Sequence, residues 1–251
     1  MQKYKYIICI IFIVLTGITA VFFMRRKEES GMDVFPNAER AEKARIPKLE
    51  EGVNVHELEN DIFEVLGPES VAISTDRSSG SGILWKCDGK KVMIVTTKHL
   101  MQDFEHGELE LWTAEKLEFS KTDVHVSEEL DLAVIITSSD KKLKLSKTGA
   151  ENFSVENTLE MGEVLWIIDS VYGAASGISN CSVASSLFFL EDYGTEMILL
   201  YGDGKTGMSG SPIYDEDGKL VAMMSGMSEN GTTLAAVPAD KIMKFIETLE
   251  E

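Results

Sequence analysis

Cysteine and proline are scarce in this sequence: its 251 residues contain three cysteines and five prolines. So few prolines, together with 20 glycines and a hydrophobic content of 44%, indicate a globular chain and exclude a largely disordered one. Cys9 lies in an apolar segment near the N-terminus. Cys87 and Cys181 are able to pair only outside the cytoplasm and only if the fold brings them together, so we expect two unpaired, partly buried thiols.

Metal ligands and basic side chains are also lacking. The histidines His56, His99, His106 and His125 are scattered, and no cluster of cysteine and histidine has metal-ligand spacing, so we expect no metal and no cofactor. Lys and Arg number 24 against 42 Asp and Glu, which is a net charge of −18. Because nucleic acid is itself an anion, this imbalance disfavours nucleic-acid binding and favours cationic partners or simple solubility.

The N-terminal segment carries a local excess of positive charge. Five basic residues and no acid lie in residues 1–27, where they flank an uncharged apolar run over residues 6–24. A helix of about 20 apolar residues crosses a bilayer core, so residues 1–27 are predicted to be a transmembrane anchor with basic flanks. The alternative is a cleaved signal peptide, whose apolar core is usually shorter, about 7–15 residues. With one N-terminal span, the body is expected outside the cytoplasm.

The rest of the chain divides into a linker and one folded domain. Residues 28–56 are charged and contain few large apolar groups, which is typical of a linker. Residues 57–251 are predicted to form the domain, which begins with a short helix over residues 57–66, where Leu58, Ile62 and Leu66 have helical spacing.

From residue 70 onward the apolar residues form short runs separated by turns. We expect strands at 71–73, 82–85, 92–95, 109–112 and 132–136 in a first unit, and at 165–168, 173–183, 187–189, 197–200, 212–214, 220–224 and 233–237 in a second. Such closely spaced strands predict an all-β fold with a first barrel at about 68–140 and a second at about 156–239. A terminal helix over residues 240–250 has one apolar face and is expected to dock on the second unit.

Three residues of the types that form a nucleophilic triad occur in the order His99, Asp131, Ser209. His99 ends one apolar strand and Asp131 begins another, so both would be anchored beside a core. In such triads the serine attacks, the imidazole accepts its proton and the carboxylate orients the imidazole. With His99 and Asp131 in the first unit and Ser209 in the second, we expect a site at the seam between them.

Ser209 lies in the loop Gly207-Met208-Ser209-Gly210-Ser211-Pro212. Glycines beside a serine allow two or three backbone N–H groups to point at one spot, which suits a carbonyl that becomes an oxyanion when it is attacked. Taken alone, the loop is equally a glycine- and serine-rich turn. His99 and Asp131, in suitable positions upstream, favour the catalytic interpretation.

Four sequence motifs, found in the same order along the chain, resemble those of one known family. Ser79-Gly80-Ser81-Gly82-Ile83, the run from Val95 to Leu100, Asp131-Leu132-Ala133-Val134 and the loop from Gly207 to Pro212 resemble motifs of the trypsin-like (chymotrypsin-fold) serine proteases, in the style of the HtrA/Deg group. The likeness covers about residues 60–249. It implies two six-stranded antiparallel β-barrels. A PDZ domain, usual in that group, is not expected because the sequence ends after the terminal helix.

The resemblance also implies a role for each matching residue. His99 would be the general base, Asp131 the orienting carboxylate and Ser209 the nucleophile. The N–H groups of Gly207 and Ser209, with Met208 between them, would form the oxyanion hole. The loop departs from the family pattern at two positions: Met208 replaces an Asn or Asp, and Ser211 replaces the second glycine of the motif.

The substrate pocket is indicated by three further residues. Asp203 lies six residues before Ser209, where trypsin-like enzymes place the acid that holds an Arg or Lys side chain. A turn residue in Gly202-Asp203-Gly204 is the other interpretation, and it is the one we favour. Ser225 and Gly226 would line the pocket entrance in either case.

The predicted function is a single-pass, membrane-anchored serine endopeptidase that cleaves extracytoplasmic polypeptides through a Ser-His-Asp triad and an acyl-enzyme. A catalytically weak or inactive trypsin-like module, used for peptide binding or sensing, is the alternative. If the apolar segment is a signal peptide, the protein is secreted. The sequence specifies no oligomeric state.

Overall fold

The structure is a computed structural model that describes residues 63–143, 153–154 and 159–250. The predicted anchor over residues 1–27 and the linker over residues 28–56 lie outside these residues. Residues 63–66 are helical and form the described end of the expected entry helix. Within the described ranges, no helix is both long and apolar enough to cross a membrane.

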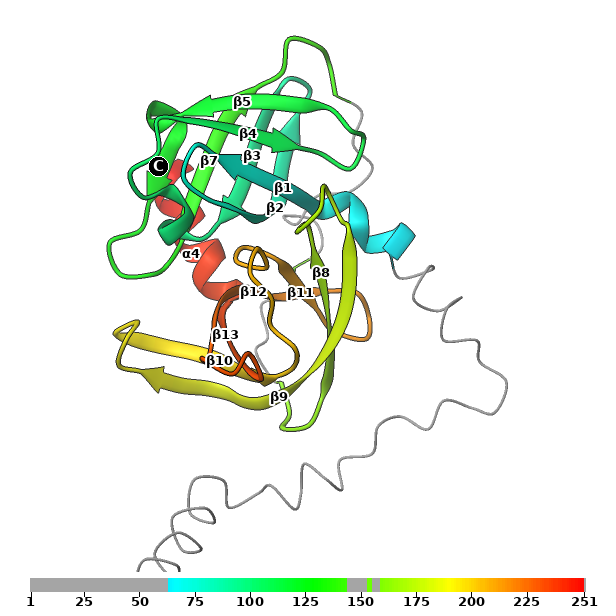
Figure 1. The fold of residues 1–251 in the computed structure, drawn as a ribbon, viewed down its shortest axis with the longest axis vertical. Coiled ribbons are helices and arrows are strands. Elements are labelled where there is room, and N and C mark those ends of the chain that lie inside the picture. The colour runs from blue at the N-terminus through cyan, green and yellow to red at the C-terminus, as the bar shows by residue number, and fades with distance from the viewer. Residues whose placement is uncertain (1–62, 144–152, 155–158, 251) are drawn as a thin grey trace, which may run out of the picture. The chain divides into compact units, whose positions relative to one another are not determined.

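The first unit is a seven-stranded antiparallel sheet in the order β5-β4-β1-β2-β3-β7-β6 (Figure 1). Its strands are β1 (Ser70–Thr75), β2 (Ser79–Asp88), β3 (Lys91–Thr96), β4 (His106–Glu110), β5 (Lys116–Ser120), β6 (Val124–Val126) and β7 (Ala133–Ser138). Three short 3-10 helices accompany them: η1 (Gly67–Glu69), η2 (Lys98–Met101) and η3 (Lys121–Asp123). The sequence did not predict β5 or β6, both of which are short.

The first unit is therefore a half-barrel, and the prediction of a closed six-stranded barrel is wrong here. The edge strands β5 and β6 do not pair with each other, because η3 turns the chain between them and β6 pairs with β7. A capping box between Ser120 and Asp123 fixes that turn. The open side is bridged by a side chain: Thr137 Oγ1 on β7 donates to the Glu118 carbonyl on β5 at 2.9 Å.

The second unit is a closed barrel in the order β10-β13-β12-β11-β8-β9, as predicted for this half (Figure 1). Its strands are β8 (Val164–Asp169), β9 (Gly177–Leu190), β10 (Thr195–Tyr201), β11 (Pro212–Tyr214), β12 (Leu220–Met227) and β13 (Thr233–Pro238). The two strands expected near 173–183 and 187–189 are one long strand, β9. Its far end forms a hairpin with β10.

Alternation along the strands creates three apolar clusters. On β3, Val92 and Ile94 point into the first unit, whereas Met93 and Val95 point the opposite way, toward the second unit. This explains the uninterrupted apolar run at 92–95, since both faces of the strand are buried. The second unit has its own interior cluster, which includes Leu165.

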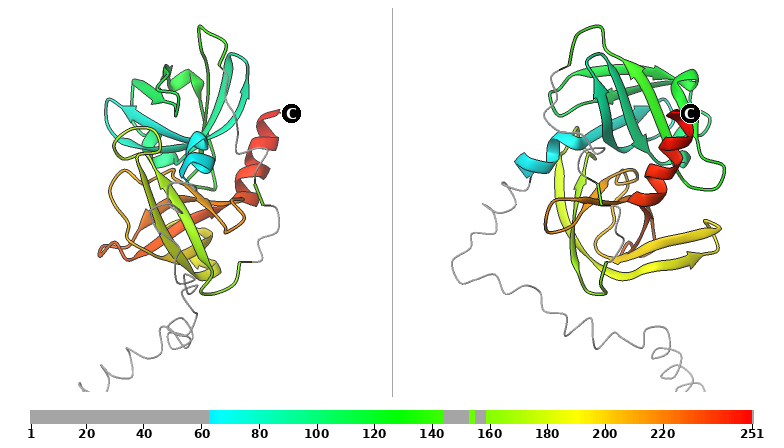
Figure 2. Two further views of the ribbon diagram at one scale, coloured as in Figure 1. Left: turned by 90° about the vertical axis from the view of Figure 1, so that its right-hand side faces the viewer. Right: turned by 180° about the vertical axis from the view of Figure 1, so that it is seen from behind.

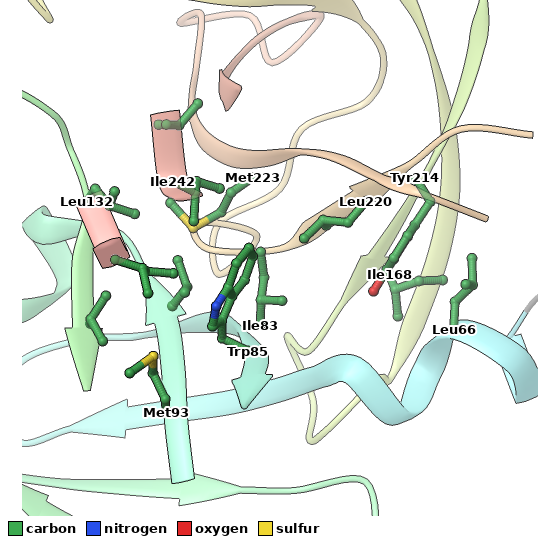
Figure 3. Packing of buried hydrophobic residues seen from close by; sticks show 14 of the residues in the cluster. Leu66, Ile83, Trp85, Met93, Leu132, Ile168, Tyr214, Leu220, Met223 and Ile242 are labelled. Atoms are coloured by element: carbon green, nitrogen blue, oxygen red, sulfur yellow. The ribbon is translucent and has the colours of Figure 1, made fainter. Parts of the chain in front are cut away.

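The seam cluster joins the two units (Figure 3). Its buried members come from both units and from the C-terminal helix, and include Leu66, Ile83, Trp85, Met93, Leu132, Ile168, Tyr214, Leu220, Met223 and Ile242. Truncating one such large side chain to alanine typically costs about 2–5 kcal/mol. The two units are thus held at a contiguous apolar interface, and the active-site groups lie along it.

Helix α4 (Ala239–Glu250) follows β13 and lies against both units (Figure 2). Its buried Ile242 and Ile246 belong to the seam cluster. At its far end Glu250 accepts a hydrogen bond from Lys86 Nζ on β2 at 2.8 Å. The helix was predicted to dock on the second unit, and the structure adds this contact with the first.

Candidate active site

His99 is held just beyond the end of β3. It lies in η2, where its neighbours Leu100 and Met101 are buried in the first unit's interior cluster. Those two apolar side chains fix the turn, so the imidazole projects away from the core and its side chain is 41% exposed. The backbone N–H of His99 also donates to Asp131 Oδ1 at 2.9 Å.

Asp131 lies before β7, next to the fully buried Leu132. Its Oδ2 is 2.8 Å from His99 Nδ1, and it also accepts a hydrogen bond from Ser225 Oγ on β12. Burial alone would raise the pKa of the Asp131 carboxyl, but the hydrogen bonds from His99 and Ser225 outweigh that effect, and the pKa lies below its ordinary value. The carboxylate is therefore charged at neutral pH.

Ser209 completes a line of three groups. His99 Nε2 and Ser209 Oγ are 3.0 Å apart. Because the Asp131 carboxylate only accepts hydrogen bonds, Nδ1 of His99 must carry the proton of the neutral imidazole. Nε2 is then an acceptor for the Ser209 hydroxyl proton, which is the arrangement needed for a general base.

The loop around Ser209 leaves two backbone donors unused. Among the described residues, neither the Gly207 N–H nor the Ser209 N–H has a hydrogen-bond partner, whereas Met208 N donates to Lys205 O at 3.2 Å and Gly210 N to Met224 O at 2.8 Å. These two free donors are the ones expected to form the oxyanion hole. Gly207 has φ of +95°, which glycine adopts readily.

The two departures from the family motif both point into the protein. Met208 is 1% exposed and packs in the second unit's interior cluster, so an apolar side chain suits this position. Ser211 is fully buried, and its hydroxyl has no partner among the described residues. Ser209, in contrast, is in contact with His99, so the structure brings the expected serine to the imidazole.

Ser81 on β2 fastens the nucleophile loop to the first unit. Its N–H donates to Ser209 O at 2.8 Å and its Oγ donates to Gly207 O at 3.1 Å. The same Oγ accepts the N–H of Ser170 at 3.0 Å. The approach is so close that a Cβ on Gly210 would lie 1.9 Å from the Ser81 carbonyl oxygen.

The three groups open into a cleft of about 810 Å³ between the two units. Ser225 and Gly226 line it, together with Met227; Met224 borders it too, but its side chain is buried in the second unit's interior cluster. Asp203 is exposed and does not line the cleft. The flanking Gly202 and Gly204 donate to the carbonyls of Thr232 and Gly231, at 3.1 and 2.7 Å, which holds this segment against the loop between β12 and β13.

The two described cysteines do not line the cleft. Cys87 and Cys181 are free thiols, as predicted, and burial raises the pKa of Cys181 to about 12. Within the described residues, no three His, Cys, Asp or Glu side chains are grouped so that they would hold a metal ion.

Sequence reasoning missed two residues of the site, Ser81 and Tyr193, and the contact made by a third, Ser225. Ser225 was placed only at the pocket entrance, yet it donates to Asp131. Ser81 stands in the glycine-serine motif, so a signal was present, but its bonds to the nucleophile loop depend on the packing of the two units. Tyr193, which also lines the cleft, lies in the β9–β10 turn, and no motif indicated it.

The fold and the site together define a trypsin-like peptidase built from two β units. A family model described as a trypsin-like peptidase domain matches residues 80–223, more than half of the sequence. The chain belongs to this family. The prediction of a trypsin-like peptidase domain is thereby confirmed.

Individual relatives agree with this assignment. The pro-apoptotic serine protease NMA111 of Vanderwaltozyma polyspora is 30% identical over 115 residues, which cover 46% of this chain and 11% of that protein. The serine protease HtrA-like of Staphylococcus aureus is 26% identical over 192 residues, which cover 68% of this chain and 23% of that protein. The chain thus spans less than a quarter of the length of either relative.

A solved structure shows the same fold. The crystal structure of Deg5 superposes with a TM-score of 0.60 at 20% sequence identity, and covers 78% of this chain and 95% of that one.

Proposed function

We propose that this protein is a serine endopeptidase in which Ser209 is the nucleophile, His99 the general base and Asp131 the carboxylate that orients His99. The observation that carries the proposal is the unbroken line of contacts from Asp131 Oδ2 to His99 Nδ1 at 2.8 Å and from His99 Nε2 to Ser209 Oγ at 3.0 Å. Both distances are within hydrogen-bond reach, as proton transfer requires.

The chemistry follows from these positions. Ser209 Oγ attacks the scissile carbonyl carbon while its proton passes to His99 Nε2, and the imidazolium that forms is stabilised by the Asp131 carboxylate. His99 then returns the proton to the leaving amine as the C–N bond breaks, which leaves an acyl-enzyme on Ser209. A water molecule, deprotonated by His99, attacks that ester and releases the acid.

The two unused donors in the nucleophile loop would stabilise the oxyanion. The N–H groups of Gly207 and Ser209 are available, and the peptide between Gly207 and Met208 is held at both ends by Ser81 Oγ and by Lys205 O. A donor that is already fixed in position costs no reorganisation when charge develops, and the loss of one typically lowers kcat about 10²–10³-fold.

The cleft supports a polypeptide substrate. On the cleft side, β12 is bonded to Gly210 and Ser211 through Met224, while the following residues 225–227 face the cleft. An extended peptide is able to add to such a strand edge through main-chain hydrogen bonds. Since Asp203 lies outside the cleft and Met227 lines it, we expect an apolar rather than a cationic side chain next to the scissile bond.

A fluorophosphonate probe tests this function directly, because it reacts with an activated serine hydroxyl. We expect the purified wild-type protein to be labelled on Ser209 and to cleave peptides, and Ser209→Ala to do neither. Ser211→Ala is the matched control: its hydroxyl is buried and lacks a partner among the described residues, so labelling should persist. Unlabelled folded wild type, with peptide turnover no faster than that of Ser209→Ala, would establish the inactive binding module instead.

We also propose that residues 1–27 anchor the enzyme in the membrane with the domain outside the cytoplasm, where it would meet extracytoplasmic polypeptides. The support is the uncharged apolar run over residues 6–24 between basic flanks. The full-length protein should resist alkaline extraction from membranes, and deletion of residues 1–27 should release it. A mature N-terminus near Val21, found by mass spectrometry, would show a secreted protein with a cleaved signal.

A further inference from the structure

The turn that joins β9 and β10 places a tyrosine in the cleft. Tyr193 lines the cleft, and its ring packs against the seam cluster. The turn is held by the backbone, because the N–H groups of Tyr193 and Gly194 both donate to Leu190 O, at 3.1 and 2.9 Å. Gly194 has φ of +64°, which allows the tight reversal. Tyr193 is therefore positioned by the hairpin as well as by its own packing.

Helix α4 supports the same turn from outside. Lys241 Nζ donates to Thr195 Oγ1 at 3.0 Å and to the Glu196 carbonyl at 2.7 Å, at the first two residues of β10. The β9–β10 turn is thus tied to an element that belongs to the seam between the units. A loop fixed in this way can present a side chain at a defined place in the cleft.

The Tyr193 hydroxyl lies over Gly226. A Cβ built on Gly226 would be 2.0 Å from the Tyr193 oxygen, far closer than any real contact. Gly226 has a negative φ, so the backbone itself does not require glycine there. The steric constraint is the phenol, and the two positions are therefore coupled: Tyr193 occupies the space that any side chain at position 226 would take.

This arrangement bears on substrate choice. Gly226 is the middle residue of the β12 edge, residues 225–227, on which we place the extended substrate. A peptide residue that passes over Gly226 has to share its space with the phenol. We propose, on the basis of the peptidase function proposed above, that Tyr193 is a specificity-determining residue that restricts this substrate position to small side chains.

The phenol remains a neutral wall of the cleft at neutral pH. Burial raises the pKa of Tyr193; the hydrogen bond with Ser225 acts in the opposite direction, and the carboxylates of Asp131 and Asp192 raise the pKa further. The uncharged ring and hydroxyl therefore exclude a large side chain by volume, without adding a charge to the cleft.

A position-scanning peptide library, cleaved by the full-length protein, tests the proposal. We expect wild type to select Gly, Ala or Ser at one position within a few residues of the scissile bond. In Tyr193→Ala, kcat/KM for peptides with Leu or Phe at that position should rise about 10-fold or more relative to Ala, the scale of hydrophobic pocket discrimination. Tyr193→Phe removes only the oxygen that lies over Gly226, and its Cζ would be 3.4 Å from a Cβ there, so the preference should relax in part and less than in Tyr193→Ala.

Phe189→Ala is the matched control. It removes an aromatic ring from the same hairpin, but Phe189 is 58% exposed and does not line the cleft, so the library profile should not change. An identical relaxation in Phe189→Ala and Tyr193→Ala would assign the effect to the hairpin as a whole and overturn the proposal. An unchanged profile in Tyr193→Ala would also overturn it, because the tyrosine would then not be the selecting element.

A double substitution tests the coupling itself. Gly226→Ala should lower kcat/KM strongly when Tyr193 is present, and the Tyr193→Ala/Gly226→Ala pair should recover most of that loss. Fluorophosphonate labelling of Ser209 reports folding and the triad independently of peptide selection. Wild type that the probe does not label would refute the peptidase function. Variants that are labelled and active, but that keep the wild-type library profile and show no recovery of kcat/KM in the double variant, would refute only the role of Tyr193.

Discussion

The two β units contribute to the site in different ways. The half-barrel supplies side chains, His99 and Asp131, from the ends of β3 and β7, where buried neighbours hold them. The closed barrel supplies Ser209 and two backbone donors from a loop. Imidazole and carboxylate need only a rigid attachment, whereas adjacent N–H groups that converge on one spot need unusual backbone angles, which strands do not provide. That loop is in turn held by Ser81 of the half-barrel.

Removal of a catalytic group from either unit should have the largest effect. We expect His99→Ala and Ser209→Ala each to lower kcat about 10⁴–10⁶-fold, and the double variant to be no worse than the single ones, because the groups act as a unit. Steady-state kinetics with one peptide substrate measures this. Multiplicative losses in the double variant would show that the two units act independently.

The next largest effect is expected on stability, at the close contact between Gly210 of the closed barrel and Ser81 of the half-barrel. Gly210→Ala should lower the free energy of unfolding by about 3–5 kcal/mol, because its Cβ would meet Ser81 O at 1.9 Å and its φ is +88°. Gly194→Ala is the control, with a similar φ of +64° and nothing within 4 Å of the new Cβ. It should cost only the backbone strain, about 1–2 kcal/mol. Urea denaturation separates the two, and equal losses would contradict a steric contact at the seam.

A buried hydrogen bond across the seam should have a smaller effect that depends on pH. Tyr214 on β11 donates to Glu69 Oε2 of η1 at 3.0 Å, and Tyr214→Phe should cost about 1–3 kcal/mol. Burial, and then the Glu69 carboxylate, raise the pKa of Tyr214 well above its ordinary value. The stability that this group contributes is therefore complete below the unfolded-state pKa of about 10 and is lost as the pH rises through the folded-state pKa.

Urea denaturation across the alkaline range tests this sign. The wild-type free energy of unfolding should fall more steeply above about pH 10 than that of Tyr214→Phe. Tyr172→Phe, at a residue that is 91% exposed, should follow the wild type. Parallel curves for wild type and Tyr214→Phe would exclude a raised pKa at Tyr214.

The smallest effect on kcat is expected from loss of the hydrogen bond by which the half-barrel holds the loop around Ser209. Ser81→Ala removes the bond from Oγ to Gly207 O and should lower kcat about 10-fold, the equivalent of 1.4 kcal/mol, with little change in KM. Ser179→Ala removes a buried hydroxyl that has no partner among the described residues, and kcat should be unchanged. A higher KM with unchanged kcat would show that Ser81 supports substrate binding rather than the oxyanion donors.

The local sequence pattern was sufficient to predict a strand where both of its faces are buried or where a recognisable motif lies at its end. The run from Val92 to Val95 predicted β3, and the apolar run after Asp131 predicted β7. It was insufficient for β5, β6 and the full length of β9. These segments mix polar and apolar residues, since one face of each is partly exposed, so no apolar run marks them even though each pairs with the strand next to it in sequence.

The sequence by itself determined the all-β class, the division into two units and the three residues proposed for the triad, because periodicity and motif spacing are local properties of the chain. Only the tertiary structure decided that the first unit stays open, that Asp203 lies outside the cleft, that Ser81 and Tyr193 join the site, and that Ser225 donates to Asp131. The open half-barrel follows from the turn at η3, whereas the rest depends on which surfaces meet when the seam cluster is buried, and that packing joins residues as far apart in sequence as Ser81 and Gly207.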